Sequence, residues 1–194
     1  MIGNQFIFIH IPRTGGSSLE RILLSLEAVQ SWQGLNSKRI VDQYVGPEKH
    51  YKASRVQDLV GHAHWQQALK LSIVRNPFDK VISHYFQPYY REINALSDKS
   101  LDFFLDAYQP APHEDGITCC DYLDRDVDLI IRYENYEEAL LALLAPLGVQ
   151  LHQIKERIGP VRSGGDYREF YSSHTRQKVE DLYRDDLVRF HYAF

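Results

Sequence analysis

The segment that constrains this chain most is residues 6–18, which read FIFIHIPRTGGSS. The apolar run from Phe6 to Ile11 predicts a buried strand that breaks at Pro12, and residues 17–28 repeat apolar side chains at helical spacing. A strand, a glycine turn and a helix N-terminus together form an anion-binding site. The first N–H groups of the helix have no intrahelical partner, and the helix dipole adds partial positive charge there.

The turn between this strand and helix carries side chains that suit a phosphate or sulfate group. Gly15 and Gly16 let the backbone approach a ligand closely, and Arg13 supplies a full positive charge. Additional donors are the hydroxyls of Thr14, Ser17 and Ser18. A nucleoside-triphosphate loop would have a lysine directly after its last glycine, whereas here the basic residue precedes the glycines. An ordinary strand–turn–helix with a structural glycine elbow is the alternative.

Residues 69–86, LKLSIVRNPFDKVISHYF, predict a second strand and helix. The run from Leu71 to Val74 is short, apolar and rich in β-branched residues, as in a central parallel strand. Asn76 suits the N-cap of the following helix, Pro77 its first position and Asp79 its first turn. A capped amphipathic helix without a ligand is the alternative interpretation of this segment.

The two segments resemble the two phosphate-binding motifs of sulfotransferases, in the branch that includes many bacterial and carbohydrate sulfotransferases. The first is similar to H-x-P-K-T-G-G-(T/S)-S, with Arg13 in place of the lysine, and the second to R-(N/D)-P-x-x-R-x-x-S-x-(Y/H). The resemblance implies that residues 13–18 bind the 5′-phosphosulfate of 3′-phosphoadenosine 5′-phosphosulfate (PAPS), and that Arg75 and Ser83 bind its 3′-phosphate. It also implies sulfuryl transfer without a metal to a hydroxyl or amine, with a carbohydrate or small metabolite as the favoured acceptor.

The stretch VGHAHW, between the two motifs, supplies candidates for the catalytic base. The apolar pair Leu59–Val60 predicts the end of a strand, after which His62 and His64 would point to the same side. Sulfotransferases often carry Gly-His just before their 3′-phosphate strand. The resemblance therefore implies that His62 takes the acceptor proton, with His64 in reserve. A structural role for both histidines and metal binding through H-x-H are alternatives.

The rest of the chain predicts an α/β fold in which a central parallel sheet is flanked by helices on both faces, a P-loop-like three-layer arrangement. Residues 127–131 form a third strand candidate and 132–148 a helix, which together resemble the R-Y-E element of the family. We interpret Glu134 as structural, with a position in the active site as the alternative. Ligands in such sheets bind at the carboxyl ends of the strands. Near the C-terminus, a basic glycine-containing turn resembles a nucleotide-covering loop, which implies nucleotide contacts for Arg162 and Arg168; a solvated loop is the alternative.

Composition limits the partners and the setting. With 194 residues and no evident linker, we expect a single domain over residues 1–194. The net charge of −4 gives no bulk attraction to nucleic acid, and no segment has the pattern of a membrane span or signal peptide. The adjacent Cys119 and Cys120 imply no disulfide framework. We expect a cytoplasmic enzyme whose partners are PAPS, its product 3′-phosphoadenosine 5′-phosphate (PAP) and an acceptor.

Two other functions fit parts of the sequence. One is a small phosphoryl-transfer kinase with a degenerate phosphate loop, but the expected lysine and magnesium-binding acid are not visible. The other is a nucleotide-binding module without catalysis, which Arg13 in place of lysine favours. The sequence leaves the acceptor and the oligomeric state open.

Overall fold

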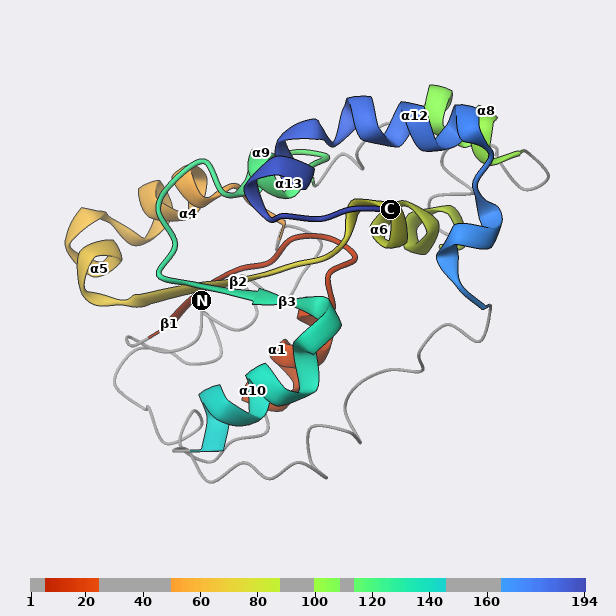
Figure 1. Cartoon of the computed structure of the whole chain (residues 1–194). Helices are drawn as coiled ribbons and strands as arrows, with labels where there is room; N and C mark the ends of the chain where they lie inside the picture. The colour runs from red at the N-terminus through yellow and green to blue at the C-terminus, as the bar shows by residue number, and fades with distance from the viewer. Residues whose placement is uncertain (1–5, 25–49, 88–99, 109–113, 146–164) are drawn as a thin grey trace.

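The computed structural model describes residues 6–24, 50–87, 100–108, 114–145 and 165–194 (Figure 1). Within these ranges, three parallel strands form one sheet in the order β1 (Phe6–Ile9), β2 (Leu69–Val74) and β3 (Leu129–Arg132). Phe8 lies opposite Leu71, which lies opposite Leu129. Because all three strands run in the same direction, their carboxyl ends meet at one edge of the sheet.

Helices cover both faces of this sheet (Figure 1). The helices α1 (Gly16–Leu24) and α10 (Tyr136–Leu144) lie on one face; α4 (Ala53–Val60), α9 (Cys119–Tyr122) and α13 (Arg184–Arg189) lie on the other. Successive residues of β1 alternate between the two cores: Phe8 packs with α1 and α10, whereas Ile7 and Ile9 pack on the opposite side. The predicted α/β class with a parallel central sheet is therefore confirmed.

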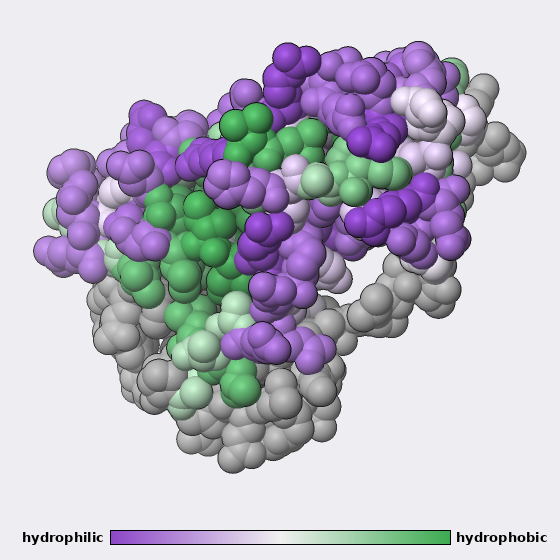
Figure 2. All heavy atoms as spheres, in the orientation of Figure 1, coloured by the Kyte–Doolittle hydropathy of each residue, from purple (hydrophilic) through white to green (hydrophobic). Residues whose placement is uncertain are grey.

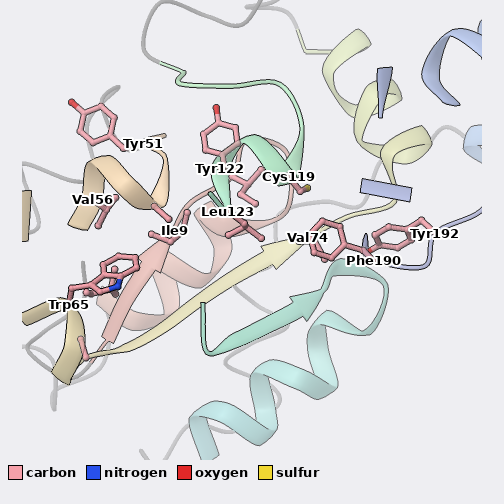
Figure 3. Packing of buried hydrophobic residues seen from close by; sticks show 14 residues of the cluster. Ile9, Tyr51, Val56, Trp65, Val74, Cys119, Tyr122, Leu123, Phe190 and Tyr192 are labelled. Carbon is pink, nitrogen blue, oxygen red and sulfur yellow. The ribbon is translucent and has the colours of Figure 1, made fainter. Parts of the chain in front are cut away.

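The core on the α4 side extends to the end of the chain (Figure 3). Phe190 and Tyr192, which follow α13, pack in the same cluster as Val74 at the carboxyl end of β2. Figure 2 shows this side in space-filling form, with hydrophilic residues over α12 (Ser173–Leu182) and hydrophobic residues gathered between α4 and α13. The C-terminal segment thus covers the sheet next to the edge where ligands bind in this class of fold.

A third cluster forms around α6 (Pro77–Tyr85), which leads away from the carboxyl end of β2. This helix packs with α8 (Leu101–Ala107), α12 and the 3₁₀ helix η4 (Tyr167–Phe170). Its start follows the sequence prediction: the side chain of Asn76 accepts a hydrogen bond from the Phe78 N–H at 3.1 Å, Pro77 is the first residue, and Asp79 lies in the first turn. α12 begins with a capping box between Ser172 and Thr175.

The predicted strand end at Leu59–Val60 is wrong, because these residues belong to α4. Ala53 and Val56 are buried and Val60 packs partly against the same core, a three-and-four spacing that places one helical face on the sheet. Gly61 then turns with φ of 84°, and α5 (His62–Gln67) leads directly into β2. Consequently α5 lies at the amino end of the sheet (Figure 1). Among the described residues, no helix is long and apolar enough to cross a membrane.

Candidate anion-binding site

The turn between β1 and α1 has an unusual backbone conformation. Arg13 has φ of 64° and Gly15 has φ of 91°, and both lie in the left-handed region that disfavours most side chains. The hydroxyl of the fully buried Thr14 donates to the Ile11 carbonyl at 2.9 Å. Thr14 therefore shapes the turn from inside, whereas Ser17 lies exposed at the start of α1 and Ser18 is largely buried.

Both glycines of the turn are closely packed against other side chains. A Cβ at Gly16 would lie 2.3 Å from Cδ2 of His10, and a Cβ at Gly15 would lie 3.0 Å from the Tyr133 ring. His10 is itself fixed, because its Nδ1 lies 2.6 Å from a carboxylate oxygen of the buried Glu20 in α1. The glycines are thus required by internal packing as well as by any approach of a ligand.

Arg75, at the carboxyl end of β2, is held on three sides. Its Nε and Nη2 lie 2.8 and 2.7 Å from one oxygen of Asp79, and its Nη1 donates to the Arg13 carbonyl at 3.0 Å. The guanidinium carbon lies 4.1 Å from the centre of the Tyr133 ring, a cation–π arrangement. The arginine of the second motif is therefore attached to the backbone of the first.

Arg13 in turn reaches the second motif. Its Nε and Nη2 donate to the Ser83 hydroxyl at 3.1 and 2.9 Å, and its Nη1 donates to the Gln87 side chain at 3.1 Å. Two guanidinium groups, one hydroxyl and the N-terminus of α1 are thus brought together at one edge of the sheet. Such an arrangement suits a ligand with two separated anionic groups.

The residues after β3 support this arrangement, and two of them, Tyr133 and Tyr136, were not singled out from the sequence. Tyr133 packs between Gly15 and Arg75, and the Tyr136 hydroxyl donates to the Gly15 carbonyl at 2.9 Å. Glu134, interpreted from sequence as structural, accepts hydrogen bonds from the Asn76 N–H at 2.8 Å and the Tyr192 hydroxyl at 2.9 Å. The available signal was the position of two tyrosines directly after a strand, at the edge where ligands bind.

His50 also lies at this edge and was not singled out from the sequence. Its ring contacts the His10 ring edge-on, with centroids 4.5 Å apart, and its Nδ1 lies 2.9 Å from the His10 carbonyl. Since a carbonyl only accepts hydrogen bonds, the neutral imidazole carries its proton on Nδ1 and a lone pair on Nε2. His50 precedes α4 outside any strand or helix pattern, so periodicity gave no signal for it.

A further histidine, His84, is buried at the end of α6. Its Nδ1 lies 2.7 Å from the Tyr108 hydroxyl. Burial, followed by the nearby positive charges of Lys80, Arg13 and Arg75, holds the pKa of His84 well below its ordinary value. His84 is therefore neutral at neutral pH and adds no positive charge to the site.

The structure does not bring His62 and His64 to this site. The expectation that they follow a strand at the carboxyl edge is wrong, because both lie in α5 at the amino end of β2. Among the other expected residues, Arg162 lies outside the described residues. Arg168 lies in η4, where it pairs with Asp166 at 3.1 Å and stacks on Tyr167.

No group of three or more histidine, cysteine or acidic side chains that could hold a metal ion occurs within the described ranges. Among known protein families, the model described as "Sulfotransferase family" matches residues 3–193. No curated protein and no solved structure matches the chain.

Proposed function

This chain belongs to the sulfotransferase family, and from that premise we propose that it moves a sulfuryl group from PAPS to a hydroxyl or amine of a carbohydrate or small metabolite. The observation that carries the choice of donor is the connection between the two motifs: Arg75 binds the Arg13 carbonyl, and Arg13 binds Ser83. One ligand that carries phosphate groups on both its 5′ and 3′ oxygens would use both motifs at once.

In this proposal the amides of residues 15–18 hold the 5′-phosphosulfate, and Arg75 and Ser83 hold the 3′-phosphate. The N-terminus of α1 favours the negative charge of the 5′-phosphosulfate. Arg13 connects the two motifs and stabilises the charge that develops on the leaving phosphate oxygen, as preorganised donors do in other transfer reactions. We further propose that Arg168 and Arg162 contact the nucleotide; Tyr167, next to Arg168, contacts the Asn76 side chain at 3.2 Å.

We propose His50 as the catalytic base in place of His62. The His50 ring lies edge-on to the His10 ring and its Nδ1 faces the His10 carbonyl, so Nε2 is the ring nitrogen that we propose to take the proton. The acceptor O–H would give its proton to Nε2 while its oxygen bonds to sulfur, and the bond between sulfur and the phosphate oxygen would break to release PAP. The charges balance without a metal.

The test uses radiolabelled PAPS with a panel of neutral and charged sugars, phenols and amines. We expect transfer to at least one acceptor, a loss of roughly 10²–10⁴-fold in His50→Ala and little change in His62→Ala, the matched histidine at the opposite edge. Turnover lost in His62→Ala but kept in His50→Ala would refute the assignment of the base. Transfer of phosphate from ATP instead would support a kinase, and PAP binding without any transfer would support a non-catalytic nucleotide-binding module.

The setting of the enzyme is also part of the proposal. We propose a single domain over residues 1–194 in the cytoplasm. Cys119 and Cys120 are free thiols, which is compatible with a reducing compartment. Burial is the main reason why the pKa of Cys120 rises to about 12, so neither redox chemistry nor thiolate catalysis is expected from it.

A further inference from the structure

Asp79 occupies a position next to Arg75 that the proposed chemistry does not explain. It lies four residues further along the chain, in the first turn of α6, where one of its oxygens accepts from Nε of Arg75 and pairs with Nη2. Both side chains are largely buried, with 11% of Arg75 and 19% of Asp79 exposed. A carboxylate in this place has two opposite effects on an incoming phosphate, since it orients the arginine but also repels the anion.

The geometry indicates which groups of Arg75 are left for a ligand. A guanidinium has five N–H donors in a rigid plane. The contacts with Asp79 and the Arg13 carbonyl use three of them, and the face of the plane rests on Tyr133. Within the described residues, the other two N–H donors of Arg75 have no hydrogen-bond partner. Because Asp79 holds the Nε edge, these two donors keep a fixed direction.

We infer that Asp79 is a positioning residue that gives the site its preference for a 3′-phosphorylated nucleotide. This inference rests on the proposed function, since it assigns the 3′-phosphate to Arg75. An arginine that is already oriented loses less rotamer freedom on binding, and this gain exceeds the repulsion between Asp79 and the phosphate. Asp79 acts through Arg75 and does not itself contact the nucleotide.

Isothermal titration of the whole chain with PAP and with adenosine 5′-phosphate (AMP) tests this. The quantity that matters is the ratio of the two affinities, because a general loss of structure lowers both. In Asp79→Asn, which keeps the shape and removes the charge, we expect the PAP-to-AMP preference to fall on the order of tenfold, as when other residues that orient a ligand-binding side chain are lost. Affinity for AMP should stay unchanged.

Two further variants make the experiment specific. Asp102→Asn is the matched control: Asp102 also lies in the first turn of a helix, α8, and pairs with a lysine, Lys178, at 2.8 Å, but it faces α12. It should leave the preference unchanged. In an Arg75→Ala background, adding Asp79→Asn should have no further effect on the preference, because Asp79 acts only through that arginine. If Asp79→Asn does not fold, Asp79→Ser is measured in its place, and we expect the same fall in the PAP-to-AMP preference.

The possible outcomes separate this inference from the proposed donor. If the wild type binds PAP and AMP equally, the assignment of the 3′-phosphate to Arg75 fails, and the role of Asp79 fails with it. If the wild type prefers PAP and Asp79→Asn keeps or increases that preference, PAPS remains the donor and Asp79 is a repelling charge or a helix-stabilising one. Only a selective fall in the preference supports the positioning role.

Discussion

Glu134 is expected to stabilise the fold by joining three segments that are distant in the sequence. One of its oxygens accepts the Asn76 N–H at 2.8 Å and the other accepts the Tyr192 hydroxyl at 2.9 Å. A hydrogen bond to a charged group contributes about 1.5–3 kcal/mol. The side chain is 37% exposed, so solvent screening lowers this value, and we take about 1 kcal/mol for each bond.

In Glu134→Gln the amide oxygen can accept one of the two donors, while the amide NH₂ faces the other. We therefore expect a loss of about 1–2 kcal/mol in the free energy of unfolding, and a loss of about 2 kcal/mol or more in Glu134→Ala, where both donors lose their partner. Equilibrium unfolding in urea, with midpoint and slope fitted together, measures both values.

The matched control is Glu138→Gln, an exposed carboxylate in the first turn of α10. It should change stability by no more than about 0.5 kcal/mol. If Glu134→Gln is as stable as Glu138→Gln, the two hydrogen bonds contribute nothing net, and Glu134 does not hold the segments together. When Glu134→Gln is combined with Tyr192→Phe, a loss smaller than the sum of the two single losses would confirm that the Tyr192 bond carries its share.

Two further predictions concern the histidines around the site. Because the pKa of His84 is lowered in the folded state, the unfolded chain binds the extra proton. Stability should therefore fall as pH drops below about 6.5, by about 1 kcal/mol over the first pH unit. Urea unfolding at several pH values should show this dependence in the wild type and a flatter one in His84→Gln, and equal slopes in the two proteins would contradict it. In thermal unfolding, Gly16→Ala should cost about 1–3 kcal/mol, because its Cβ would lie 2.3 Å from a His10 ring held by Glu20. A Gly16→Ala protein as stable as the wild type would show that the loop can shift.

The sequence by itself determined those features that depend on neighbouring residues. The apolar runs predicted β1, β2 and β3, and their alternation with helices predicted the parallel sheet. Asn76 and Pro77 predicted the start of α6, because capping and the fixed φ of proline act within a few residues. The glycines after the first apolar run predicted the turn between β1 and α1. In contrast, the strand end predicted at Leu59–Val60 was wrong, because two apolar residues fit a strand or a helix equally well. Burial of one face of α4 against the sheet determined that these residues are helical.

Only the tertiary structure decided which side chains meet at the carboxyl edge. Parallel strands far apart in the chain place Arg75 on the Arg13 carbonyl, Tyr133 between Gly15 and Arg75, and His50 against His10. None of these contacts leaves a periodic pattern, because each joins a loop or strand end to another across a large sequence separation. The connection between β2 and α5 likewise decided that His62 lies at the far edge. Local sequence thus specifies the elements and the glycine turn, whereas the packing of the sheet specifies the partners of each charged group.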